Sequence, residues 1–174
     1  HCVFRPLRLN LVAQKAFPNF SFAPYLYLID KRVTYPHEGL HQHFLIKKVR
    51  SRDDKTLRVW SAACSRGQEV YSLAMVLTTA LKERAPDIKL DILGTDIDPN
   101  SVTIAKNGVY PWNEIKEIPL HYLNSFWARG TGEISEFAKA KQPLKANCRF
   151  EVQNLLDLKL AKEQPFDIIF CRNV

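Results

Sequence analysis

The feature that most constrains this chain is a run of small residues between two apolar segments of different periodicity. It lies in RVWSAACSRGQEVYSLAM, residues 58–75. Residues 57–61 predict a buried strand, and apolar positions three and four apart over residues 69–82 predict a helix. The turn between them contains one glycine, Gly67, and is followed by an acid, Glu69. Such a turn is typical of a ligand site in an α/β protein, because small side chains let a ligand lie against the backbone.

The alternation of strand and helix continues along the chain. Further strands are predicted at residues 91–95, 149–152 and 166–170. A helix is predicted after Asp98, which is suited to the N-cap, with Pro99 at the first helical position and Gly108 just past the end. Strands that alternate with helices predict an α/β fold with a parallel, Rossmann-like sheet.

Aromatic residues gather between the second and third predicted strands. Trp112, Phe126 and Trp127 all fall there. Large aromatic side chains more often fill a core than bind a ligand, so these residues predict a small packed subdomain.

The basic residues are concentrated in the first third of the chain. Residues 1–56 contain ten Lys or Arg against four Asp or Glu, whereas residues 57–174 contain fifteen against fourteen. The polar segment 51–55 reads as a linker, so we expect a basic N-terminal region of undetermined fold, 1–56, before the α/β domain, 57–174. The positive charge favours an acidic partner or substrate surface, with a solvated basic face as the equal alternative.

Cysteine spacing and hydropathy indicate an intracellular protein without a membrane span. Cys2, Cys64, Cys148 and Cys171 form no CxxC pair, which favours reduced thiols over a disulfide framework. No apolar run reaches the ~18 residues of a transmembrane helix, and no secretory signal is visible. We therefore expect a cytoplasmic protein that is not inserted in a membrane. The basic residues are scattered and no recognition motif accompanies them, so nucleic acid is not an expected partner.

The composition of the turn after the first strand favours a cationic ligand. A pyrophosphate site would place several glycines at the start of the helix, whereas this turn has one glycine and Glu69. S-adenosylmethionine carries an ammonium and a sulfonium and suits a carboxylate better. Asp96 follows the second strand, where an acid can accept hydrogen bonds from both ribose hydroxyls. The alternatives are a plain turn acid at position 96 and a first-turn acid at position 69 favoured by the helix dipole.

A set of short segments, taken in order, resembles the chemotaxis receptor methyltransferase family (CheR type), which makes glutamyl methyl esters from S-adenosylmethionine. The segments are RVWSAACSRGQEVYSLAM, LGTDID, NGVYPWNEI, FWARGTG, QNLLD and FDIIFCRNV. The resemblance covers residues 57–174, about two thirds of the chain. It implies a protein-glutamate O-methyltransferase of signal transduction. Its substrate would be a chemoreceptor-like protein, and its cofactor product would be S-adenosylhomocysteine.

The resemblance also implies which residues would bind the cofactor. They are Ala62, Ala63, Cys64, Gly67, Glu69, Asp96, Asn154, Leu155, Arg172 and Asn173. The loop that ends at Gly67 would lie along the methionine part, with Glu69 at its amino group and Asp96 at the ribose. The pair 154–155 would border the adenine, and the pair 172–173 would line the site beyond the fourth strand. A loop cap at position 154 and a surface ion pair at position 172 are the alternatives.

Methyl transfer to a glutamate needs alignment more than proton transfer. A free Glu has a pKa of roughly 4.3, so the nucleophile is already ionised at neutral pH and needs no general base. Alignment of the attacking oxygen, the methyl carbon and the sulfur is then the main catalytic tool. The sequence therefore assigns no catalytic residue, and no metal ion is expected.

Two departures from the family leave a second function open. The family carries an Asn-x-Thr-x-Phe-Phe-Arg stretch before the first strand, whereas residues 33–44 read VTYPHEGLHQHF and contain no arginine. Family members also continue past the position of Val174. We therefore expect a sheet that is incomplete at its C-terminal edge, to be covered by further chain, a partner or a second copy. The second hypothesis is a non-catalytic, cofactor-binding regulatory domain of the same fold.

A third hypothesis rests on HEGLH, residues 37–41, which matches the HExxH pattern of zinc hydrolases. On a helix the two histidines would share a face, and Glu38 would activate a zinc-bound water. Gly39 weakens the middle of such a helix. The alternative is a polar turn that leads into a short helix at residues 42–50.

Overall fold

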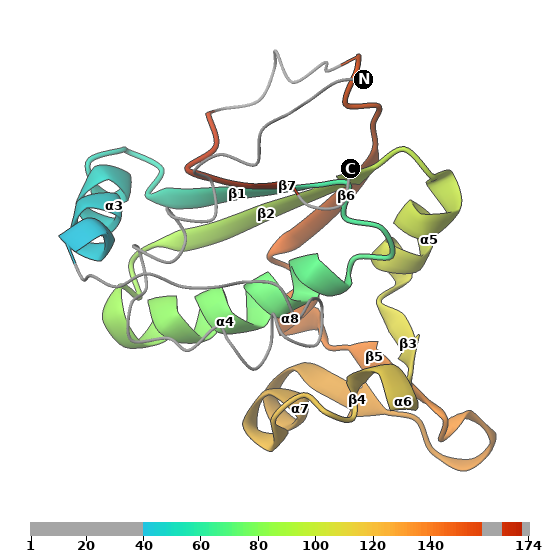
Figure 1. The fold of residues 1–174 in the computed structure, drawn as a ribbon. Coiled ribbons are helices and arrows are strands. Elements are labelled where there is room, and N and C mark those ends of the chain that lie inside the picture. The colour runs from blue at the N-terminus through green and yellow to red at the C-terminus, as the bar shows by residue number, and fades with distance from the viewer. Residues whose placement is uncertain (1–39, 158–164, 172–174) are drawn as a thin grey trace.

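The central element of the molecule is a four-stranded parallel sheet in the order β6-β2-β1-β7 (Figure 1). The computed structural model describes residues 40–157 and 165–171, with the backbone alone at 40–44. The strands are β1 Thr56–Ala62, β2 Lys89–Asp96, β6 Cys148–Val152 and β7 Ile168–Cys171. Val59 of β1 pairs with Ile92 of β2 and with Ile168 of β7. The predicted Rossmann-like α/β fold is therefore confirmed.

Helix α4, Gln68–Arg84, runs along one face of this sheet, with the short helix α8, Gln142–Lys145, beside it (Figure 1). Val70 and Ala74 of α4 are completely buried, because the apolar stripe predicted from the 3.6-residue period faces the strands. No helix in the described ranges is long and apolar enough to cross a bilayer.

Helix α5, Pro99–Asn107, begins and ends as its sequence predicts. The Asp98 carboxylate accepts hydrogen bonds from the backbone N–H of Asn100 at 3.1 Å and of Ser101 at 3.0 Å. A further bond from the Ser101 hydroxyl, together with these two, holds the pKa of Asp98 below its usual value. Gly108 ends the helix in the left-handed conformation, with φ 63°.

A second, smaller sheet lies between α5 and α8 in the chain, and residues 109–140 are called the small subdomain below. Its antiparallel strands are β3 Val109–Pro111, β5 Phe137–Ala140 and β4 Trp127–Arg129, in that spatial order. Helices α6 Trp112–Ile115 and α7 Leu120–Phe126 and the 3₁₀ turn Gly132–Ile134 complete it. Phe126 and Trp127 are buried as predicted, whereas Trp112 is only partly buried. Figure 1 shows the small subdomain on the side of α4 that faces away from the sheet.

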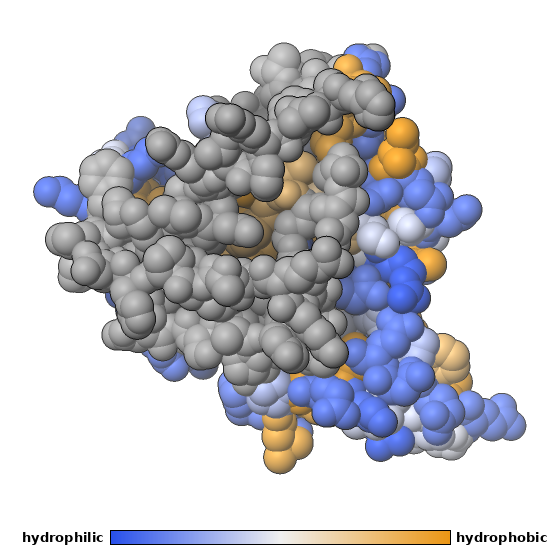
Figure 2. Space-filling view, viewed as in Figure 1, coloured by the Kyte–Doolittle hydropathy of each residue, from blue (hydrophilic) through white to orange (hydrophobic). Residues whose placement is uncertain are grey.

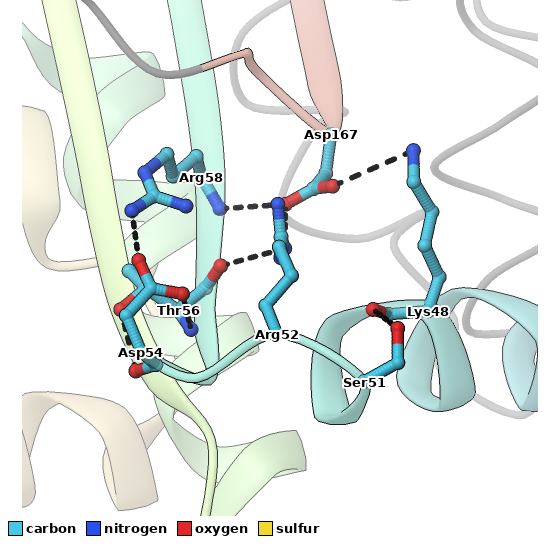
Figure 3. Close-up of polar contacts among 7 residues, drawn as sticks. All are labelled: Lys48, Ser51, Arg52, Asp54, Thr56, Arg58 and Asp167. Atoms are coloured by element: carbon cyan, nitrogen blue, oxygen red, sulfur yellow. Dashed lines mark hydrogen bonds and ion pairs between the residues drawn. The ribbon is translucent and has the colours of Figure 1, made fainter.

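Helix α3, Leu40–Arg50, and the turn after it are fastened to the edge strand β7 (Figure 3). The side chain of Asp167 is 1% exposed and accepts hydrogen bonds from the backbone N–H of Arg58 at 3.0 Å and from Arg52 Nη2 at 2.7 Å. Lys48 Nζ of α3 lies 3.9 Å from the other carboxylate oxygen. One buried carboxylate thus joins α3, β1 and β7.

Two sequence predictions concern this N-terminal part. The short helix expected at residues 42–50 is confirmed as α3, and its Leu45 and Val49 belong to the main hydrophobic core. Residues 37–39 of the HEGLH motif lie outside the described residues. The division of the chain at residue 56 stays a prediction.

Candidate functional site

The loop between β1 and α4 lies at the carboxyl end of the sheet and has an unusual backbone. Ala63, Ser65 and Gly67 have φ of 55°, 50° and 86°, so three of its residues are left-handed and only one of them is glycine. The N–H of Cys64 donates to the carbonyl of Thr95 at 2.9 Å, which ties the loop to the end of β2. Non-glycine residues in this conformation are strained by roughly 1–3 kcal/mol each, and such residues cluster at ligand sites.

Asp96 joins the loops that follow three strands. One carboxylate oxygen accepts from the backbone N–H of Ser65 at 2.7 Å, and the other accepts from the N–H of Asp98 at 3.0 Å. The carbonyl of Asp96 also accepts from the N–H of Gln153, just after β6, at 2.8 Å. Asp96 therefore lies where β1, β2 and β6 end, which is the position predicted for a ribose-binding acid. Each carboxylate oxygen accepts about two hydrogen bonds, so ribose hydroxyls can still be accommodated.

Glu69 supplies a second carboxylate on the other side of the loop. It lies in the first turn of α4, is 9% exposed, and accepts a hydrogen bond from the buried Ser61 hydroxyl at 2.8 Å. Burial, with the charges of Asp96 and Glu69, raises the pKa of the Cys64 thiol to about 12. The two carboxylates thus lie on either side of the loop, with one bonded to Ser65 and the other to Ser61. A pair of carboxylates at this position favours a cation.

The small residues of the loop divide into buried and accessible positions. Ala62 and Cys64 are buried, and Ala62 pairs with Thr95 of β2 and with Cys171 of β7. Ala63 is partly accessible. A Cβ at Gly67 would lie 2.7 Å from the Cβ of Ala105, so this glycine is required by packing against α5 as well as by its positive φ.

The predicted residues beyond β6 and β7 are placed less completely. Asn154 is exposed, and its Oδ1 accepts a hydrogen bond from the N–H of Leu156 at 2.9 Å. This bond caps the loop after β6, which is the alternative role named for Asn154 in the sequence analysis. Leu155 packs partly against the core formed by Trp60 and Leu93. Arg172 and Asn173 lie outside the described residues.

Exposed apolar residues at the same end of the sheet were not predicted as site residues. Ile97, directly after Asp96, is 64% exposed. Val152, the last residue of β6, and Leu156, shortly after it, are exposed as well. Figure 2 shows apolar groups at the surface around the end of the sheet from which α5 begins. The sequence did contain a signal for this surface, which is the isolated isoleucine between two acids in TDID. An apolar side chain in a polar turn is unfavourable in water, so it can indicate a contact with a ligand.

Comparison with known proteins assigns this arrangement to a family. A family model described as "CheR methyltransferase, SAM binding domain" matches residues 32–174. The chain belongs to this family. S-adenosylmethionine is accordingly the cofactor of the domain, and the resemblance read from the sequence is confirmed. The fit is chemical as well: a negative loop suits the ammonium and sulfonium, Asp96 suits a ribose, and the exposed Ile97 suits an apolar ring.

The CheR-type relatives are similar to this chain over most of its length. Chemotaxis protein methyltransferase 2 of Pseudomonas aeruginosa is 38% identical over 120 residues, which is 69% of this chain and 42% of that protein. The chemotaxis protein methyltransferase of Borreliella burgdorferi is 34% identical over 75% of this chain and 45% of that protein. The one from Escherichia coli is 36% identical over 79% and 47%, respectively. The chain spans about half the length of these curated relatives.

Proposed function

We propose that this domain transfers the methyl group of S-adenosylmethionine to glutamate side chains of a chemoreceptor-like protein in the cytoplasm, giving glutamyl methyl esters. The observation that carries the proposal is the strained loop fixed to Asp96 at the carboxyl ends of β1 and β2. Further support comes from the family and from relatives named chemotaxis protein methyltransferases. The acceptor, a receptor glutamate, requires an experimental test.

The roles of the site residues are part of the proposal. The backbone of residues 62–67 would follow the methionine part, with Glu69 as the carboxylate for its positive charge. Asp96 would accept hydrogen bonds from the ribose. Ile97 and Leu155 would border the adenine, with Asn154 holding the loop that carries Leu155. Arg172 and Asn173 would line the site beyond the fourth strand, as the family resemblance implies.

The chemistry asks little acid–base work of these residues. The cofactor supplies an activated methyl group, which a carboxylate oxygen can take up without prior deprotonation. The O–C bond forms as the C–S bond breaks, and the electron pair of that bond stays on sulfur. The role of the chain is therefore to hold the two reactants in line and exclude water, which the fixed loop between β1 and α4 is suited to do. The basic residues of the N-terminal region would favour approach of an acidic substrate.

A labelled-methyl assay tests the proposal. The chain is incubated with S-adenosylmethionine carrying a tritiated methyl group and with cytoplasmic fragments of chemoreceptors, and base-labile label is counted as methyl ester. We expect transfer that disappears in an Asp96→Ala variant and with fragments whose acceptor glutamates are replaced by alanine.

The same assay separates the proposal from the second candidate function. That candidate is a cofactor-binding regulatory domain without catalysis, and it is favoured by the absence of an arginine from residues 33–44. Binding of the cofactor product without methyl transfer to any receptor fragment would contradict the proposed enzyme and support this candidate.

A further inference from the structure

The loop between β1 and α4 does not adopt its conformation by local preference. Ala63 and Ser65 are left-handed although neither is glycine or asparagine. Bonds from within the sheet hold the first half of the loop, since Cys64 donates to Thr95 and Ser65 donates to Asp96. In the second half, Arg66 to Gln68, the N–H of Gly67 donates to the carbonyl of Cys64 at 3.0 Å, and further contacts come from outside the loop.

Those contacts come from the small subdomain. The hydroxyl of Tyr110, on β3, donates to the backbone carbonyl of Arg66 at 2.5 Å. The carboxylate of Glu114, on α6, accepts from the Arg66 guanidinium at 3.2 Å and from the Gln68 amide at 3.3 Å. Arg66 and Gln68 flank Gly67, so these bonds hold both sides of the residue at which the loop becomes α4. We call this set of contacts the brace.

The partners in the brace are themselves firmly placed. Tyr110 is 1% exposed and packs edge-on against Tyr71 of α4 with ring centroids 6.0 Å apart. Trp127 of β4 packs against the same Tyr71 at 5.8 Å. The small subdomain thus packs on α4 through an aromatic cluster, and its Tyr110 and Glu114 also bond the loop between β1 and α4. A shift of the small subdomain relative to α4 would therefore disturb the loop.

We propose that Tyr110 and Glu114 are positioning residues for the cofactor loop. They hold Arg66 and Gln68 so that the strained loop is formed before the cofactor arrives. This inference rests on the cofactor site proposed above for residues 62–69. A loop that spends less time in the binding conformation binds more weakly in proportion to the lost population, so weakening the brace raises the Kd.

Calorimetric titration with S-adenosylhomocysteine measures this effect. We expect Glu114→Gln and Tyr110→Phe each to weaken binding about threefold to tenfold, a modest effect because the Arg66 and Glu114 side chains are 42% and 30% exposed. Glu117→Gln is the matched control. It removes the same charge from the same part of the small subdomain, at an exposed residue, and should leave the Kd unchanged.

An exchange of charges distinguishes positioning from a general structural role. Arg66→Glu alone should weaken binding, and the double variant Arg66→Glu with Glu114→Arg should recover much of the loss. Thermal unfolding without ligand verifies that each variant is folded.

The possible results are separable. If Glu114→Gln and Tyr110→Phe both bind S-adenosylhomocysteine with the Kd of the wild type, the brace is overturned and the cofactor site is left intact. A double variant no better than Arg66→Glu would overturn the role given to the Arg66–Glu114 pair. A folded wild-type chain that fails to bind would overturn the cofactor site and the brace with it.

Discussion

At the scale of single residues, Gly67 illustrates how packing and backbone geometry act at one position. Its φ of 86° disfavours any residue with a Cβ, and a Cβ there would lie 2.7 Å from Ala105 and 3.0 Å from Phe150. The sequence predicted a sharp turn at this glycine. It did not predict the contact with α5, because that contact depends on how β2 and α5 return to the loop.

We expect Gly67→Ala to lower the free energy of unfolding by about 2–4 kcal/mol, since strain and overpacking add. The matched control is Gly132→Ala, whose φ of 57° is also left-handed but where nothing lies within 4 Å of the added Cβ. Only the backbone cost of about 1 kcal/mol remains there. Urea unfolding of both variants measures the difference, and equal losses would show that the close packing at Gly67 carries no cost.

The positions of Asp96 and Glu69 were predictable, because they follow from where the second strand ends and the first helix begins. Their roles in binding stay predictions. The left-handed φ of Ala63 and Ser65 was not predictable, because the loop is held by hydrogen bonds that its N–H groups donate to Asp96 and Thr95, which lie about 30 residues away. Ser61, which bonds Glu69, was likewise hidden, since a serine in a strand usually signals nothing.

At the scale of elements, the boundaries set by capping chemistry were predicted best. Asp98, Pro99 and Gly108 delimit α5 as expected. The last strand was expected at residues 166–170 but is β7, Ile168–Cys171. Phe166 stacks on Trp60 with ring centroids 5.6 Å apart. Asp167 donates its backbone N–H to the Arg58 carbonyl at 2.9 Å, but the N–H of Arg58 bonds the Asp167 carboxylate, so the regular pairing of β1 with β7 begins only at Ile168. The strands of the small subdomain have three or four residues each and are too short for an alternation to be recognised.

The buried Asp167 should be the most sensitive polar position at the edge of the sheet. Asp167→Ala removes the partner of Arg52 and of the Arg58 N–H, so we expect a loss of about 3 kcal/mol in the free energy of unfolding. The control is Asp87→Ala, which breaks the exposed pair with Arg50 and should change stability far less. Chemical denaturation of the two variants makes the comparison, and similar losses would contradict the role given to Asp167.

At the scale of the whole molecule, one hydrophobic core joins the parallel sheet to the small subdomain. Within it the rings of Tyr110 and Trp127 contact that of Tyr71 on α4, and α3 adds Leu45 and Val49. The parallel sheet was predictable from alternating elements. The contacts between the small subdomain and the loop that follows β1 were not predictable, because they join residues more than 40 positions apart in the sequence.

Stability should decline on the alkaline side. Burial is the main cause that raises the pKa of the Cys64 and Cys148 thiols from about 9 to about 12. A neutral thiol is favoured in the folded state, so its contribution is complete below pH 9 and is lost as the pH rises from about 9 to about 12. Burial raises the pKa of Tyr71 and Tyr110 in the same direction.

The midpoint of thermal unfolding, followed from pH 8 to pH 12, tests this expectation. The fall should be shallower in Cys64→Ala than in the wild type. Cys171→Ala is the control, because Cys171 is exposed and its replacement should alter the slope less. A wild-type profile that stays flat to pH 12 would contradict the burial of these thiols.

The central claim is that Asp96 anchors an S-adenosylmethionine site formed by the loops after β1, β2 and β6. The most direct measurement is a calorimetric titration of S-adenosylhomocysteine into the wild type, Asp96→Ala and Asp98→Asn. Asp98→Asn is the control, since asparagine is an equally good N-cap and the Asp98 carboxylate bonds the first turn of α5 rather than the loop between β1 and α4. We predict binding by the wild type and the control, weakened about a hundredfold or more in Asp96→Ala. Equal affinity in Asp96→Ala and the wild type, or no binding by a folded wild-type chain, would contradict the claim.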